Sequence, residues 1–224
     1  MFKTSSVALV AGAIVAQASA IGLDSIDTFD ADNEGWRVGN AGVAPSFEND
    51  TSFNGQPGFL RHFSDGGGPN GKWLMWSEQA DWTGDYLTAN VSGISMWLDG
   101  RTGNDTIVWI GFDGPGGWFF TPGQTLVIDN DWERFEFDIN PDSLIHSADS
   151  GGTGVAVDTL SNVERFEIFA GPGPVSYASR GDLLRGGTSE NIIWVDNIAA
   201  IPEPASVAAL GLAALVGLTR RRSA

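Results

Sequence analysis

Short runs of alternating apolar and polar residues are the main regularity of this 224-residue chain. The alternation is clearest in three segments: 93–99, 132–139 and 163–170. In the first of them, Ile94, Met96 and Leu98 share one side of an extended strand. Because successive side chains of a strand point to opposite faces, each run predicts a strand with one buried side and one side facing solvent.

The rest of the sequence predicts further strands with turn-rich loops between them. The expected strands are 25–30, 43–48, 59–63, 73–77, 106–112, 118–121, 126–128 and 192–199. The segment 141–145 is typical of a helical turn. Thirty glycines and ten prolines, with few apolar repeats of helical length, favour an all-β domain. We therefore predict a β-sandwich of two antiparallel sheets, of jelly-roll type.

The first twenty residues have the features of a secretory signal peptide. Lys3 precedes an apolar stretch over 7–15, and Ala18-Ser19-Ala20 supplies small residues for cleavage. We expect residues 1–20 to be removed, so that the mature chain begins near Ile21. Residues 21–200 then form one domain, which is long enough for a single well-buried core.

The last segment, 201–224, has three parts. Pro202-Glu203-Pro204 comes first, an uncharged apolar run over 205–219 follows, and Arg220, Arg221 and Arg222 stand behind it. Closely spaced prolines interrupt strands and helices, so the folded domain is expected to end there. The run predicts a single transmembrane helix with the arginines on the cytoplasmic side. About 15 residues span about 22 Å, less than the roughly 30 Å hydrocarbon core, which favours a processing signal over a permanent anchor.

The order and spacing of these parts resemble the PEP-CTERM sorting signal of exported bacterial proteins. The resemblance implies export, a transient stay in the inner membrane and recognition by an exosortase-type processing enzyme. It also implies a final location at the cell surface or in an extracellular matrix. An ordinary C-terminal anchor behind a proline-rich linker is the alternative.

Charge and cysteine content narrow the possible partners. Outside the two terminal segments there are eight basic and 27 acidic residues, so the domain carries a net charge of −19. Such a charge repels nucleic acid and anionic lipid surfaces. The chain has no cysteine, which excludes disulfides and thiolate metal sites.

The domain also resembles galactose-binding-like jelly rolls, and more narrowly the laminin domain IV (laminin B) type. The residues that carry the resemblance are Phe29, Gly35-Trp36, Trp73, Asp81 to Asp85, and Asp196-Asn197-Ile198. The proline that usually precedes the Gly-Asp element of laminin modules is absent. In such jelly rolls the first and last strands are neighbours and a structural calcium ion often bridges them. The resemblance therefore implies a calcium site, for which the candidate ligands are Asp27, Asp30, Asp32, Glu34 and Asp196, with Asp30 and Asp196 as first choices. A charged surface of an acidic protein is the alternative interpretation of these residues.

No constellation predicts catalysis strongly enough to assign it. Glu136 and Asp138 share one side of a predicted strand, the arrangement in which some glycosidases hold their carboxylates. Asn140 stands at the third position, and Arg134 begins the same side, so a solvated face is the alternative. The two histidines, His62 and His146, lack zinc-ligand spacing.

Nine tryptophans are the other unusual feature of the chain. Five lie on or beside alternating strands and are expected in the core: Trp36, Trp97, Trp109, Trp132 and Trp194. Four more, with one tyrosine, lie nearer to loops and form a candidate carbohydrate-binding platform: Trp73, Trp76, Trp82, Trp118 and Tyr177. Aromatic rings stack on the apolar faces of sugars while nearby carboxylates and amides bind the hydroxyls. Sealing the ends of the sandwich is the alternative role for these rings.

Together these features predict an exported, non-enzymatic envelope or matrix module, structural or adhesive, that binds extracellular polysaccharide. A secreted glycan-active hydrolase using Glu136 and Asp138 is a second possibility. A protein–protein interaction module without a sugar ligand is a third.

Overall fold

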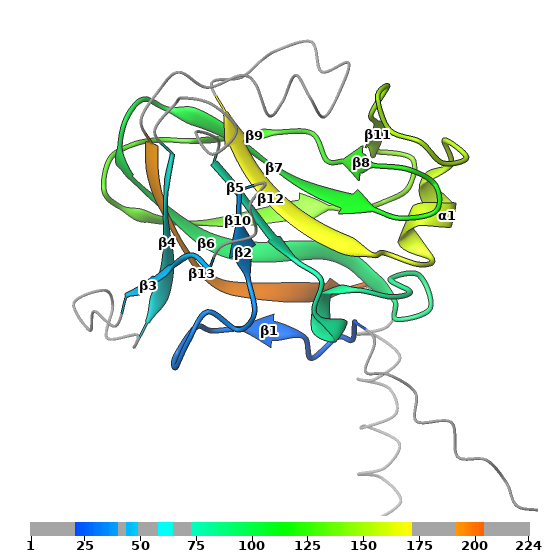
Figure 1. Ribbon diagram of the computed structural model, residues 1–224, viewed down its shortest axis with the longest axis horizontal. Coiled ribbons are helices and arrows are strands. Elements are labelled where there is room, and N and C mark those ends of the chain that lie inside the picture. Colours follow the sequence, from blue (N-terminus) through cyan, green and yellow to red (C-terminus); the bar gives the residue numbers. More distant parts are fainter. Residues whose placement is uncertain (1–20, 40–43, 49–57, 65–72, 172–190, 204–224) are drawn as a thin grey trace, which may run out of the picture.

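The computed structural model describes residues 21–39, 44–48, 58–64, 73–171 and 191–203, which form two packed antiparallel sheets (Figure 1). The first, sheet A, has the strand order β10 (Trp132–Asp138), β6 (Val91–Thr102), β13 (Asn191–Pro202), β4 (Phe59–Ser64) and β3 (Ser46–Glu48), and β1 (Ile26–Asp27) also pairs with β13. The second, sheet B, has the order β11 (Ile145–His146), β8 (Phe119–Phe120), β7 (Thr106–Asp113), β12 (Arg165–Gly171), β5 (Trp73–Ser77) and β2 (Arg37–Val38), and β9 (Gln124–Leu126) also pairs with β7. The prediction of an all-β, two-sheet sandwich is confirmed.

The core lies between the inner faces of the two sheets. Ile94, Met96 and Leu98 of β6 are fully buried there, as the alternation predicts. Ile110 and Phe112 of β7 are buried in the same core from the opposite sheet. Burial of such side chains contributes about 1.5–3 kcal/mol each, which makes this layer the main source of stability.

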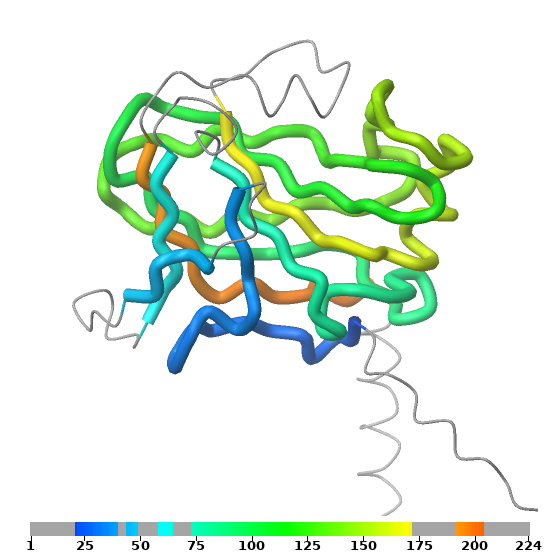
Figure 2. The backbone as a smooth tube through the Cα atoms, viewed as in Figure 1, coloured from blue at the N-terminus to red at the C-terminus, as the bar shows by residue number. Residues whose placement is uncertain are grey.

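At one end of the core, two tryptophans converge on a buried carboxylate. Trp36 and Trp82 donate their indole N–H groups to Asp27 Oδ2 over 2.5 and 2.6 Å. Both rings also pack on Phe166, with centroid distances of 5.6 Å for Trp36 and 5.2 Å for Trp82. Because Asp27 belongs to β1, these bonds fasten the first strand to the core. Its pairing with β13 places the two ends of the described chain side by side (Figure 2).

The local elements depart from the sequence prediction at several points. The segment 141–145 is a turn that leads into β11, and the α-helix, α1 (Ala156–Leu160), lies further along the chain. A 3₁₀ turn, Ala80–Trp82, was also missed. Strand β13 continues through Pro202, which pairs with Val91 after an irregularity in register. Proline is tolerated there because it stands at the end of the strand.

Sheet B is apolar on its outer face as well as on its inner face. Leu74, Trp109, Trp118, Phe120 and Phe169 form a second buried cluster there, separate from the main core. Strand β5 alternates accordingly, since Met75 enters the main core while Leu74 enters the second cluster.

Three tryptophans expected in the core lie instead on the outer face of sheet A. Trp97, Trp132 and Trp194 are half-buried, while their strand neighbours enter the core. Their inward assignment was wrong because a tryptophan on a strand says nothing by itself about which face it occupies. Trp36 is in the core as expected, and Trp109 is buried in the second cluster.

Among the described residues, no helix is both long and apolar enough to cross a membrane. The expected signal peptide over 1–20 and the apolar run over 205–219 lie outside those residues, as do Pro204 and the three arginines.

Candidate functional site

A row of side chains crosses the outer face of sheet B. Arg37 of β2 pairs with Trp76 of β5, Trp76 with Glu167 of β12, and Glu167 with Gly111 of β7. Directly paired residues of antiparallel strands point to the same face, so these positions form one line of neighbours. Strand alternation and register thus place a tryptophan between an arginine and a glutamate.

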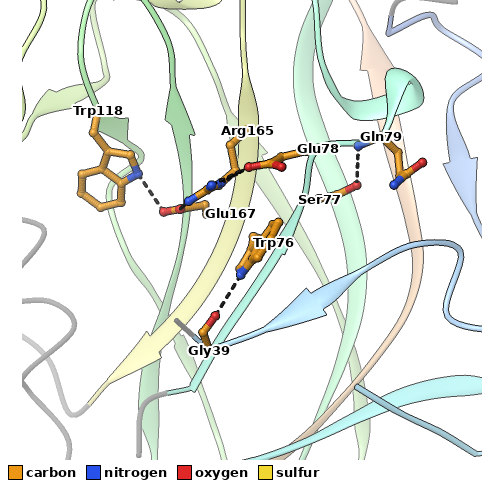
Figure 3. Close-up of polar contacts among 8 residues, drawn as sticks. All are labelled: Gly39, Trp76, Ser77, Glu78, Gln79, Trp118, Arg165 and Glu167. Atoms are coloured by element: carbon orange, nitrogen blue, oxygen red, sulfur yellow. Dashed lines mark hydrogen bonds and ion pairs between the residues drawn. The ribbon is translucent and has the colours of Figure 1, made fainter. Parts of the chain in front are cut away.

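Glu167 is the buried centre of this row, because its side chain is 0% exposed. Its Oε2 accepts a 2.8 Å hydrogen bond from Trp118 Nε1, and its Oε1 lies 3.7 Å from a terminal nitrogen of Arg165 (Figure 3). The ring of Trp118 lies over Gly111, where an added Cβ would meet that ring at 2.8 Å. Glycine at this position therefore admits the indole that binds the carboxylate.

Arg165 joins the buried part of the row to its exposed part. Its Nε donates to Glu78 Oε1 over 2.8 Å, and a second guanidinium nitrogen contacts the same oxygen. Its Cζ lies 4.6 Å from the centre of the Trp76 ring, a cation–π distance. Burial lowers the pKa of Arg165, but the hydrogen bond to Glu78 and the surrounding carboxylates outweigh this effect and raise the pKa overall. The guanidinium therefore stays charged and fixes the ring beneath it.

Trp76 is the aromatic side chain that this arrangement holds at the surface. Its ring is half-buried, and its Nε1–H donates to the Gly39 carbonyl over 3.0 Å (Figure 3). Arg37 is exposed, and nearly half of the Glu78 side chain is exposed. A positioned ring, two cations and an accessible carboxylate thus meet on one surface. These groups match the apolar and hydroxyl faces of a sugar.

The predicted platform is only partly formed. Trp73, Trp82 and Trp118 are at most 2% exposed, so they offer no ring face to a ligand from solvent. Trp73 packs in the core and donates its N–H to the His62 carbonyl, and Trp118 supports Glu167 from below. The platform therefore narrows to Trp76, while Tyr177 lies outside the described residues.

Sequence reasoning missed Arg165 and Glu167. The signal was present in part, since Glu164-Arg165-Phe166-Glu167 repeats the residues of 133–136. Both copies lie on strands, with Phe135 and Phe166 facing the core. The neighbour of the last glutamate differs between the copies, because Glu167 pairs with Trp76 whereas Glu136 pairs with Ser95. That difference depends on strand pairing, which the sequence of neither copy reveals.

Of the proposed calcium ligands, Asp27 and Glu34 already have partners within the protein. Asp27 accepts the two indole N–H groups, and Glu34 Oε1 accepts the Phe29 N–H over 3.1 Å. Burial, and then the hydrogen bond and charge of Asp27, raise the pKa of Glu34 to about 8. Burial also raises the pKa of Asp27. Both carboxyl groups therefore have contacts that stabilise the fold around Asp27, and calcium binding by this pair stays a prediction.

Asp30 and Asp196 fit a cation better. The Asp196 side chain is buried, its Oδ1 accepts the Asn197 N–H over 2.7 Å, and its Oδ2 has no hydrogen-bond partner in the described part of the chain. Burial, together with the charge of nearby Asp30, raises the pKa of Asp196 to about 6 against the lowering effect of Asn197. Asp32 is exposed and caps the Glu34 N–H. No group of three or more metal-binding side chains converges within the ranges that the structure covers.

The alternative hydrolytic pair lies on strand β10, at the edge of sheet A. Glu136 and Asp138 are both exposed, and Glu136 forms an ion pair with Arg134. Asp138 Oδ1 accepts the Asn140 N–H over 3.0 Å, so Asn140 supports a turn there. The geometry matches the solvated face that was the alternative interpretation of this segment.

Comparison with known proteins adds distant likenesses only. No protein-family profile matches the chain, and no curated protein matches it. Among solved structures, it is similar to the family 11 carbohydrate-binding module of the cellulosomal cellulase Lic26A-Cel5E of Clostridium thermocellum, with 16% identity and a TM-score of 0.45 over 83% of this chain and 97% of that one. It is also similar to CBM28, a carbohydrate-binding module specific for non-crystalline cellulose, with 14% identity and a TM-score of 0.45 over 76% and 89%. It is also similar to an exo-β-agarase, with 12% identity and a TM-score of 0.46, over 81% of this chain and 23% of the agarase chain. Likenesses this distant say nothing about a ligand.

Proposed function

We propose that this protein is an exported, non-enzymatic carbohydrate-binding module whose site is the Trp76 row on the outer face of sheet B. The observation that carries the proposal is the half-buried Trp76 ring, which lies under the Arg165 guanidinium at a position that pairs with Arg37 of β2. Glu78, the ion-pair partner of Arg165, is exposed beside it. A ring supplies the stacking surface for a sugar, and the charged groups supply donors and acceptors for its hydroxyls.

The charge of the domain supports a neutral ligand. The net charge of −19 repels anionic polymers at long range, although Arg37 and Arg165 lie within the site. Both oxygens of Glu167 are directed to Trp118 and Arg165, so the buried carboxylate orients the site and is not itself a binding group. A neutral polysaccharide fits this combination best.

We extend the proposal to sorting by an exosortase-type enzyme, with release to the cell surface or an extracellular matrix. The support is the sequence of the tail, in which Pro202-Glu203-Pro204 precedes the apolar run and three arginines. Strand β13 ends at Pro202, so the recognition motif begins where the folded domain stops. The mature mass tests this part: a chain that keeps the three terminal arginines after export contradicts processing.

The binding test is affinity electrophoresis through gels that contain soluble neutral polysaccharides, with Trp76→Ala as the variant. Loss of the stacking ring is expected to weaken binding about tenfold or more. Phe63→Ala is the matched control, because it removes a ring that is 47% exposed on the other sheet. Equal retardation of Trp76→Ala and the wild type in every binding gel would refute the site.

The same preparation decides between the alternatives. Release of reducing ends from a polysaccharide, abolished by Glu136→Gln, would establish the hydrolase. A complete absence of retardation across a broad glycan screen would favour a protein–protein interaction module instead.

A further inference from the structure

The outer face of sheet A carries a second row that the proposed site does not include. Trp132 of β10 pairs with Asp99 of β6, and Asp99 pairs with Trp194 of β13. The three side chains therefore lie side by side on one face, with both rings half-buried and the Asp99 side chain 0% exposed between them. A fully buried carboxylate on the outer face of a sheet needs partners.

Arg101 covers this row. One terminal nitrogen lies 2.6 Å from Asp99 Oδ2, and its Cζ lies 3.6 Å from the centre of the Trp194 ring. Phe59 also stacks on Trp194, with a centroid distance of 4.3 Å and an angle of 24°. These contacts fix the indole of Trp194. One quarter of the Arg101 side chain is exposed, so the guanidinium that covers the carboxylate borders on solvent.

Three buried polar atoms in this row lack hydrogen-bond partners among the described residues. They are Asp99 Oδ1, Trp194 Nε1 and Arg101 Nε. Buried polar groups in folded proteins are almost always paired, so an acceptor and two donors left together are unusual. In the Trp76 row, by contrast, the Trp118 and Trp76 indoles and Glu167 all have partners. The sheet A row has the features of a site that a ligand completes.

We propose that the Trp132–Asp99–Trp194 row is a second saccharide-binding site, specific for a neutral, hydroxyl-rich ligand. A hydroxyl group both donates and accepts, so adjacent hydroxyls of one sugar satisfy Asp99 Oδ1, Trp194 Nε1 and Arg101 Nε together. The half-buried ring of Trp132 lies beside them and contacts the apolar face of the sugar.

The charged groups around Asp99 favour a neutral sugar over an anionic sugar or a metal cation. Burial, with a smaller effect of the nearby charges of Asp129 and Asp131, raises the pKa of Asp99 to about 6 against the lowering effect of Arg101. The negative charges of Asp129 and Asp131 near the row disfavour an anionic sugar. The Arg101 guanidinium on Asp99 Oδ2 disfavours a metal cation at the same carboxylate.

The inference goes beyond the proposed function, because the two rows lie on opposite outer faces of the sandwich. One domain would then hold two glycan chains, one on each sheet. Two sites on one rigid body raise the avidity for a polymer and cross-link separate chains. The second row rests on its own unpaired atoms and does not depend on Trp76.

The test follows the indole N–H resonances of the nine tryptophans in the ¹⁵N-labelled protein. Neutral tetrasaccharides of glucose, galactose, mannose and xylose are titrated separately, and a galacturonic acid tetramer is the anionic counterpart. We expect the Trp194 and Trp132 resonances to move saturably with at least one neutral probe, with a Kd below about 1 mM, and to remain still with the acid. The same shifts are expected in Trp76→Ala.

The matched variants are Asp99→Asn and Arg134→Ala. Asp99→Asn keeps the volume of the side chain but loses the charge-assisted bond, and we expect about tenfold weaker binding at the Trp194 resonance. Arg134→Ala removes an exposed ion pair on the same face and is expected to leave the affinity unchanged. Trp132→Ala gives a second loss-of-binding variant at a half-exposed position if the Asn variant does not fold.

The outcomes separate the two proposals. Movement of Trp76 and Trp118 without Trp194 overturns the second site and leaves the proposed function standing. Movement of the Trp194 resonance without that of Trp76 overturns the Trp76 row as a binding site and supports the second site. Stillness of Trp194 with every neutral probe, or equal affinity in Asp99→Asn, Trp132→Ala and the wild type, overturns the inference.

Discussion

Replacing Glu167 by alanine tests how the buried carboxylate supports the Trp76 row. At 3.7 Å and an effective dielectric constant of about 20, its attraction to Arg165 is about 4 kcal/mol before the cost of burying the charges, which offsets much of it. The variant leaves the Trp118 N–H without its acceptor, a penalty of about 1–3 kcal/mol. Removing one partner of a buried pair costs about 3–5 kcal/mol in all.

Arg165 reduces this penalty, because it is 31% exposed and keeps Glu78 as a partner. We therefore expect Glu167→Ala to lower the free energy of unfolding by about 3 kcal/mol. For a domain of this size, the melting temperature should fall by about 6–12 °C. Differential scanning calorimetry and urea denaturation measure the two quantities independently.

The chain provides an internal control for this prediction. Glu136 ends the other copy of the same four-residue segment, pairs with Arg134 as Glu167 pairs with Arg165, and has a side chain that is 56% exposed. Glu136→Ala should cost less than about 1 kcal/mol. Equal destabilisation by the two variants, or a cost below 1 kcal/mol for Glu167→Ala, would refute the central role of the buried carboxylate.

Two further predictions concern the carboxyl groups near the chain ends. Folded Glu34 holds its proton up to about pH 8, whereas the unfolded side chain loses it near 4.5, so the free energy of unfolding should fall as pH rises between these values. Urea midpoints at pH 6 and 8.5 measure this, and persistence of the full decline in Glu34→Gln would contradict it. Calcium binding at Asp30 and Asp196 should raise the melting temperature in a way that a chelator and Asp196→Asn both abolish. An unchanged midpoint with and without chelator rejects the ion.

The architecture could be predicted from the sequence because it depends on local alternation. The three best alternating runs each formed a strand with the expected inner face, as Phe135 and Phe137 of β10 illustrate. Short strands such as β2 and β11 were missed, since two residues carry no periodicity.

The site could not be predicted to the same extent, because it depends on strand order. Glu136 and Glu167 have the same local sequence, yet one is exposed on the edge strand β10 and the other is buried on β12 between β5 and β7. Trp82 was assigned to a loop surface, but the acceptor on Asp27, 55 residues away in the sequence, draws it into the core. Such pairings of distant residues determine which tryptophan faces solvent.

The position of β13 has a mechanical consequence. This last strand lies between β6 and β4 and also pairs with β1, so the C-terminal end of the domain is the end of an internal strand. Suppose that a tether holds the protein by this end while a ligand pulls on either sheet. The force then acts along β13, parallel to the hydrogen-bond ladders that join it to β6 and β4. Many backbone hydrogen bonds then share the force at once, instead of breaking one after another as they do when an edge strand is peeled away. The strand order thus suits a module that must stay folded under tension.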